Sequence, residues 1–174
     1  MTTTPKVEVA DLFDRHGRAV RHYFRAATGS AELAEDLAQD VFVRVVRGVG
    51  EYEPRERERA WLFRIARNIL LDHRRRLAAR PSTLRVDAEP AVAATQALST
   101  DLAAALERVP DTEREAFLLA ELGGLTYDEI ARVLQITVPA VRSCIYRARL
   151  ALRSLLSPPA PLVPPLVKGT FHDD

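Results

Sequence analysis

The sequence of 174 residues contains a single cysteine, Cys144, so no disulfide bond can form within the chain. This fits a protein that works in a reducing cytoplasm. Nowhere do roughly 18 apolar residues follow one another, and we therefore expect no membrane-spanning helix. The opening residues MTTTPKVEVADLF hold no continuous apolar stretch, which argues against a secretory signal peptide.

The usual signatures of an enzyme active site are also missing. The sequence has no HExxH motif, no metal-ligand spacing, no glycine-rich loop that holds phosphate and no nucleophile motif. We therefore expect no catalytic residue, no metal, no cofactor and no small-molecule substrate. The four histidines are scattered along the chain: His16, His22, His73 and His172.

Charge is present in both signs but is unevenly distributed. The formal net charge is only +1. Residues 51–80 hold nine arginines and five acids, residues 101–129 hold eight acids and two arginines, and residues 130–156 hold five arginines and no acid. Such segregation at a net charge near zero predicts several surfaces with different partners.

The longest periodic segment runs from residue 58 to residue 80, where Pro81 ends it, and predicts one long helix. One face of this helix is expected to be core. The opposite face is a basic stripe with one amide, and Trp61 is expected on its border, with Tyr52 just upstream. The core positions are Leu62, Ile65, Ala66, Ile69, Leu70 and His73; the stripe is Arg64, Arg67, Asn68, Leu71, Arg74 and Arg75.

The composition of the stripe favours single-stranded or melted nucleic acid over an intact duplex. Arginines alone bind any polyanion. An aromatic ring beside them can stack a base that has left the duplex, and an amide can bond to a base edge. The alternative is a solvated amphipathic helix with Trp61 in the core.

Two helices are expected before the long one, and the three together predict a compact first domain over residues 7–80. The first ends near Gly29, and Ser30 can cap the second. The outward face of the second helix carries acids around an apolar residue, which is either a solvated face or a docking surface for a basic partner. This face is formed by Glu32, Asp36, Gln39, Asp40, Val43 and Arg47.

Residues 81–99 contain two prolines and many small residues without a bulky periodic pattern, which is typical of a flexible linker. Fully extended, nineteen residues reach about 65 Å. This length could span nearly two turns of duplex at ~34 Å each. The domains on either side could therefore hold separate sites on one DNA.

The second domain is expected over residues 100–156. Its first, short helix, which includes Leu102, ends at Pro110, and Asp111 is expected to cap the next helix, which Gly123 ends. The expected buried residues of that helix are Ala116, Phe117 and Leu119 to Leu122.

A helix-turn-helix completes this domain. Thr126 and Glu129 have the spacing of a capping box, in which each side chain bonds to the other residue's backbone N–H. The helix they open is followed by a tight turn at residues 135–137 and a final helix from Val138 to about Leu156.

The outward face of the final helix carries arginines and no acid. Its amino-terminal residues would point at base edges in a major groove, and the later arginines would meet phosphates. The alternative is a helical hairpin whose arginines serve solubility. The expected duplex contacts are Pro139, Arg142, Ser143, Tyr146, Arg147, Arg149 and Arg153. Residues 157–174 contain five prolines, which favours an extended or disordered tail over a helix.

The segments AEDLAQDVFVRV and AWLFRIARNILLDHRRR resemble the promoter-melting domain (region 2) of the extracytoplasmic-function (ECF) group of bacterial sigma factors. The segment LTYDEIARVLQITVPAVRSCIYRARLAL resembles their C-terminal helix-turn-helix (region 4). The resemblance covers roughly residues 8–156. It implies an all-α protein of two small helical domains that binds core RNA polymerase, directs it to a promoter and helps to open the −10 element.

The resemblance also implies roles for individual residues. Asp36, Gln39, Asp40 and Val43 correspond to the surface that docks on the clamp helices of the largest polymerase subunit. Asn68 corresponds to the position that captures a flipped base of the −10 element, and residues 49–59 to the loop that frames it. The final helix corresponds to the reader of the −35 element, although Pro139-Ala140 replaces the family's frequent Gly-Thr.

The partners that the resemblance implies are core polymerase, including the flap of its second largest subunit, promoter DNA and an anti-sigma protein, with no membrane. The implied location is the cytoplasm, at the nucleoid when polymerase is bound. One alternative is a dimeric helix-turn-helix regulator of duplex DNA, which would leave Asn68 and the rest of the stripe without a role. The other alternative, an enzyme, has no motif to support it.

Overall fold

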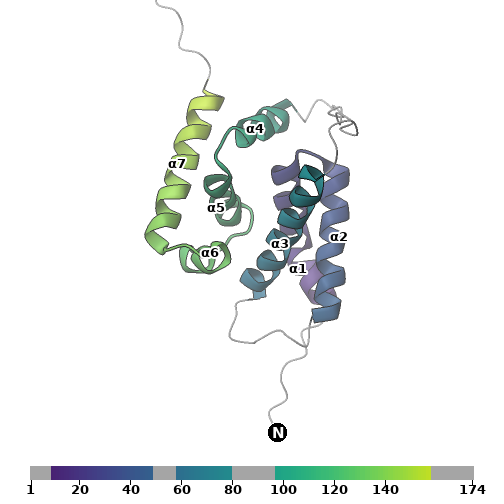
Figure 1. The fold of residues 1–174 in the computed structure, drawn as a ribbon. Coiled ribbons are helices and arrows are strands. Elements are labelled where there is room, and N and C mark those ends of the chain that lie inside the picture. The colour runs from purple at the N-terminus through teal and green to yellow at the C-terminus, as the bar shows by residue number, and fades with distance from the viewer. Residues whose placement is uncertain (1–8, 49–57, 80–96, 158–174) are drawn as a thin grey trace, which may run out of the picture.

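The computed structural model describes residues 9–48, 58–79 and 97–157, and all regular secondary structure in these ranges is helical (Figure 1). This confirms the expected all-α class. Most of the expected linker, part of the loop before the long helix, and the tail from residue 158 onward lie outside the described residues. The helices are α1 (Val9–Thr28), α2 (Ala31–Gly48), α3 (Glu58–Ala78), α4 (Ala97–Glu107), α5 (Asp111–Glu121), α6 (Tyr127–Leu134) and α7 (Val138–Leu156).

Helices α1, α2 and α3 pack against one another and form the first helical unit (Figure 1). Tyr23 is central to its core, because its ring meets Phe24 and Phe63 edge-on, with centroids 5.4 Å and 5.5 Å apart. Gly29 ends α1 in the left-handed region at φ +71°, and the Ser30 hydroxyl accepts a hydrogen bond from the Leu33 amide at the start of α2. The predicted boundary between the first two helices is therefore confirmed.

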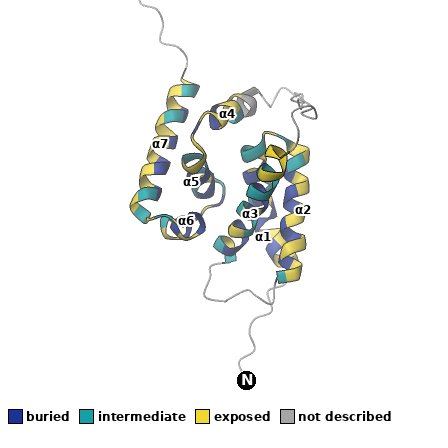
Figure 2. Ribbon diagram, in the orientation of Figure 1, coloured by how far each residue is buried: buried dark blue, intermediate teal, exposed yellow. Residues whose placement is uncertain are grey.

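Helices α4 to α7 form a second unit, in which α7 packs chiefly on α5 and α6. The apolar face of α7 is the predicted one: Val141, Ile145, Ala148 and Leu152 are all buried. Cys144 is also buried beside them, which agrees with a small apolar core residue. Figure 2 shows α7 as buried along one side and exposed along the other.

The start and the buried face of α5 differ from the expectation. The N-cap is Pro110, which makes no side-chain cap, while Asp111 is the first helical residue and pairs with Arg114. Phe117 is half-buried and Glu121 is exposed, while Glu115 and Leu118 are buried. Glu115 and Leu118 are buried because α5 lies between α7 and the first unit and therefore packs on two sides (Figure 1).

The two units contact each other through α3 with α6 and through α1 with α4 and α5. The turn before α6 lies against the first turn of α3, where a Cβ atom on Gly124 would be 2.5 Å from Arg59 Nη1. Among the helices of the described ranges, none is both long and apolar enough to cross a membrane.

Candidate nucleic-acid interface

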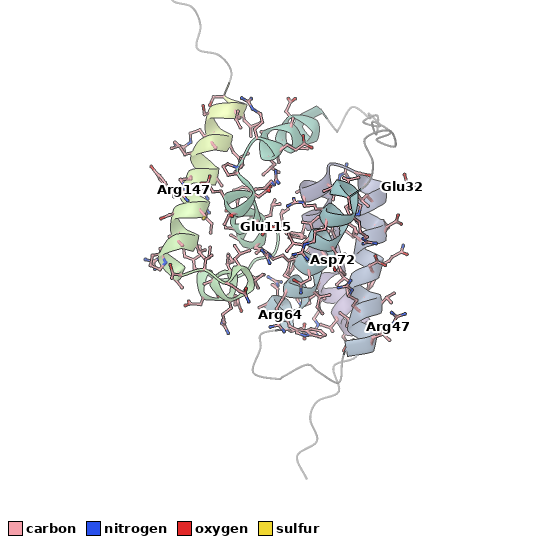
Figure 3. The ribbon with its side chains drawn as sticks, viewed as in Figure 1. Glu32, Arg47, Arg64, Asp72, Glu115 and Arg147 are labelled. Carbon is pink, nitrogen blue, oxygen red and sulfur yellow. The ribbon has the colours of Figure 1, made fainter. Side chains whose placement is uncertain are left out.

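The stripe on α3 is partly open to solvent. Arg64, Asn68 and Arg75 are exposed, whereas the side chains of Arg67 and Arg74 retain 23% and 28% exposure. Figure 3 shows Arg64 projecting from the lower part of α3. The exposed amide of Asn68 therefore lies on a surface with guanidinium groups, as the helical period predicts.

Trp61 does not border this exposed surface, and the expectation that it does is wrong for this conformation. Its residue exposure is 6%, and the next two residues, Leu62 and Phe63, are fully buried. Three consecutive buried residues need cover on more than one side of a helix. Here α1 and α2 cover one side of α3, and the turn around Gly124 meets the helix near Arg59. Tyr52, the other expected aromatic residue, lies outside the described residues.

The half-buried arginines of the stripe point at an acid of the second unit. Arg67 Nε donates a hydrogen bond to Glu115 Oε2 at 3.0 Å, and Arg74 Nη1 lies 3.7 Å from Glu115 Oε1. Figure 3 shows Glu115 on the side of α5 that faces α3. The sequence analysis did not predict that Glu115 is buried and paired with α3. Its position next to Ala116, which was expected to be buried, could have indicated this.

The expected docking face of α2 is exposed as a continuous patch of Asp36, Gln39, Asp40 and Val43. Beside it, a groove of about 460 Å³ separates α2 from the end of α3. Arg44 crosses this groove to Asp72 at 3.4 Å. Arginines outnumber acids there, which the sequence did not indicate; the lining residues are Asp40, Val43, Arg44, Arg47, Asp72, Arg75 and Arg76.

The helix-turn-helix geometry rests on local hydrogen bonds. The Thr126 hydroxyl accepts from the Glu129 amide at 3.4 Å, and Glu129 Oε2 accepts from the Thr126 amide at 2.8 Å, which confirms the capping box. Gln135 ends α6 in the left-handed region at φ 57°. The Thr137 hydroxyl then accepts from the Ala140 amide and caps α7. These bonds fix the angle between α6 and α7.

The outward face of α7 is exposed at every expected position: Pro139, Arg142, Ser143, Tyr146, Arg147, Arg149 and Arg153. Tyr146 is the most exposed large hydrophobic residue of this helix, at 68%. Within the described ranges Arg142 makes no ion pair, so its guanidinium group is available to a ligand.

Two arginines of α7 are instead paired with acids of α5. Arg147 Nε lies 2.5 Å from Glu113 Oε1, and Arg149 Nη2 lies 2.6 Å from Glu121 Oε1. The hydrogen bonds that the two guanidinium groups donate to these carboxylates raise the pKa of both arginines above the usual range. The arginine side chains of both pairs are more than half exposed, at 54% and 55%, so their guanidinium groups stay accessible from solvent.

Two family models match the chain. Residues 12–80 match Sigma-70 region 2, and residues 99–152 match Sigma-70 region 4. The sigma factor CarQ of Myxococcus xanthus is 36% identical over 154 residues, which cover 84% of this chain and 87% of that protein. The ECF sigma factor SigM of Mycobacterium tuberculosis is 33% identical over 147 residues, which cover 83% of this chain and 75% of that protein. This chain belongs to the ECF sigma factors.

Other relatives support the same assignment. The ECF sigma factor SigE of Mycolicibacterium smegmatis is 37% identical over 157 residues, 84% of this chain, and the chain spans only 61% of that relative's length. The solved structure of CnrH in complex with the cytosolic domain of CnrY superposes with a TM-score of 0.69 at 29% identity and covers 85% of this sigma factor and 86% of that chain. The fold is also that of the sigma factor RpoE, solved with the anti-sigma factor NepR from Bartonella quintana, at a TM-score of 0.68, 23% identity and coverage of 84% and 95%.

Proposed function

We propose that this sigma factor binds core RNA polymerase, directs it to specific promoters and helps to melt the −10 element. The observation that carries the proposal is that one chain has two separate exposed surfaces suited to nucleic acid. The α3 stripe exposes Asn68 and Arg64, and α7 exposes a base-reading end next to phosphate-binding arginines. The polymerase supplies the chemistry, and this chain supplies recognition and strand capture.

Docking on polymerase is assigned to the exposed face of α2. Asp36, Asp40 and the apolar Val43 are suited to a basic partner segment with an apolar centre, such as the clamp helices of the largest subunit. Contact between region 4 and the flap of the second largest subunit completes the holoenzyme. Opposite charge across such a surface mainly raises the association rate and selects the partner.

Duplex recognition is assigned to α7. Its amino-terminal residues Pro139, Arg142, Ser143 and Tyr146 enter the major groove of the −35 element. Because Arg147, Arg149 and Arg153 follow on the same outward face, they meet the phosphates on either side of the groove. A helix-turn-helix of this kind holds the protein in register on double-stranded DNA upstream of the melted segment.

Strand capture is assigned to the stripe of α3. The arginines hold the non-template strand, and Asn68 bonds to the edge of one unstacked base. Flipping a base costs a few kcal/mol, and the contacts that the flipped base makes with Asn68 and the arginines must return a similar amount. Since these terms nearly balance, opening depends on which base is offered to Asn68.

The cellular setting follows from the same function. We place the protein in the cytoplasm, at the nucleoid when polymerase is bound. An anti-sigma protein is a proposed regulator, because the solved relatives CnrH and RpoE were each determined with a bound partner, CnrY and the anti-sigma factor NepR.

The test is the variant Asn68→Ala in holoenzyme on a cognate promoter. Asn68 is exposed, so the fold is retained. We expect closed-complex binding near the wild-type level and a loss of permanganate-reactive thymines at the −10 element. His22→Ala, an exposed change on α1, is the control and should melt normally. Normal melting by Asn68→Ala would refute the strand-capture role.

The main rival is a dimeric helix-turn-helix regulator. It predicts tight binding of the free chain to an intact palindromic site, without polymerase. A mobility-shift assay with and without core polymerase separates the two functions.

A further inference from the structure

Glu115 is a deeply buried carboxylate whose ion pairs join the two regions. It belongs to α5 in region 4, and its side chain is only 7% exposed. Both of its oxygens face arginines of α3 in region 2: Oε2 accepts from Arg67 Nε at 3.0 Å, and Oε1 lies 3.7 Å from Arg74 Nη1. Figure 3 shows Glu115 on the side of α5 that faces α3.

A carboxylate at this depth requires cationic partners. Removing a charge from water is costly unless ion pairs and hydrogen bonds replace the lost hydration. Tyr23, fully buried in region 2, is close enough that the carboxylate affects it: burial raises the pKa of its hydroxyl, and Glu115 raises that pKa further. The arginines are thus the groups that make this position tolerable for a negative charge.

The other acids of α5 behave differently. Glu113 pairs with Arg147 and Glu121 pairs with Arg149, so both of these ion pairs stay inside region 4. Asp111 reaches Arg74 only at 3.9 Å and is 76% exposed. Among the described residues, Glu115 is therefore the one deeply buried acid of α5 whose pairs cross from one region to the other.

We propose that Glu115 is an internal competitor for DNA, which occupies the phosphate-binding arginines of α3 and holds region 4 closed against region 2 in the free protein. This rests on the proposed function of the stripe. Arg67 Nε cannot donate to Glu115 and to a DNA phosphate at the same time. A carboxylate and a phosphate offer the same ligand chemistry to a guanidinium group, namely anionic oxygens that accept its N–H bonds.

Closure and strand capture therefore compete for these two arginines, whose side chains are only 23% and 28% exposed in the closed form. Linkage is reciprocal: whatever opens the two regions raises the affinity of the stripe for single-stranded DNA, and DNA bound to the stripe opens the regions by the same factor. Asn68 remains exposed in the closed form, whereas Arg67 and Arg74 are engaged with Glu115. The free chain is thus restrained from binding stray single strands.

The experiment measures the separation of the two regions without DNA. Spin labels are attached at Ala31→Cys on α2 and Ser154→Cys on α7, both exposed, in a Cys144→Ala background of the full chain. Pulsed electron–electron double resonance then gives the distribution of distances between the two spin labels. The variants are Glu115→Gln, which removes the charge with little change of shape, and Glu115→Arg, which faces Arg67 and Arg74 with a like charge. Glu113→Gln is the matched control.

We expect a narrow, short distance in the parent chain and in Glu113→Gln, and a longer, broader distribution in both Glu115 variants. Circular dichroism should show unchanged helix content. The affinity of free Glu115→Gln for a short fluorescein-labelled single-stranded DNA should rise by at least about fivefold, the lower end of usual coupling factors.

An unchanged distance in both Glu115 variants would overturn the closure. A longer distance with unchanged DNA affinity would overturn the competition. Because the distance is measured without DNA, closure is tested separately from strand capture, which the melting assay on Asn68→Ala tests by itself.

Discussion

Thr126→Ala and Arg142→Ala should affect different properties of region 4. Thr126 stabilises the helix-turn-helix, whereas Arg142 is proposed to contact DNA. The Thr126 hydroxyl caps α6 and also donates to Glu129 Oε2 at 2.9 Å. Arg142 lies exposed on the first turns of α7 and makes no ion pair within the described ranges. The first variant should lower stability, and the second should lower affinity for the −35 element.

The size of the stability effect follows from the capping box. Losing an N-cap costs about 0.5–2 kcal/mol. The upper half of that range applies here, because Glu129 is 4% exposed and its carboxylate loses the hydroxyl, although it keeps the Thr126 amide at 2.8 Å. We expect a loss of about 2 kcal/mol. For a region of this size that corresponds to roughly 10 °C in melting temperature.

The affinity effect of Arg142→Ala should be about 1–3 kcal/mol if its guanidinium group reads a guanine edge, which is a factor of roughly 5 to 150. Its stability should change by less than about 0.5 kcal/mol, since it is an exposed surface residue. Thr126→Ala, at a temperature where region 4 remains folded, should bind with affinity close to that of the wild type.

The assays are urea unfolding followed by circular dichroism, and holoenzyme binding to a duplex that carries the −35 element at fixed salt. Thr126→Ser is the control, because it keeps the hydroxyl and should behave as wild type in both assays. A large affinity loss in Thr126→Ala under folded conditions would refute the purely structural role of Thr126. Normal affinity in Arg142→Ala would refute the proposed DNA contact of Arg142.

Two further predictions concern packing and docking. Gly123→Ala should destabilise region 4 by about 1–3 kcal/mol in the same urea assay, because the new Cβ would lie 2.5 Å from the Leu119 carbonyl oxygen; unchanged stability would contradict this close approach. The double variant Asp36→Arg/Asp40→Arg should lose co-purification with core polymerase while it keeps its helix content, whereas Asp128→Arg in region 4 should co-purify normally; retention of the double variant on polymerase would exclude this face of α2 as the docking surface.

Local signals accounted for most of the fold. The capping box at Thr126 and Glu129 depends on two residues three positions apart, so the sequence contains all the information needed to place it. The apolar face of α7 follows from helical periodicity in the same way. The exposed positions of the docking face of α2 and of the outward face of α7 follow from the same period, since each is the complement of a buried stripe.

The errors arose where two segments compete or where distant segments meet. Asp111 has a side chain that could cap a helix, but Pro110 occupies the N-cap position with φ −53°. Asp111 is therefore the first helical residue and not the cap. The burial of Glu115 depends on contacts between regions 2 and 4, because its partners Arg67 and Arg74 belong to α3. Trp61 is buried by residues outside its own helix. Helical periodicity within one segment encodes neither contact.

The position of Trp61 gives the protein a built-in optical reporter. It is the only tryptophan of the chain, and its indole is enclosed at the start of α3. Emission excited selectively from indole therefore comes from one site, in the first turn of α3. A shift of that emission to longer wavelength on adding polymerase or DNA would report water reaching this site, without any attached dye.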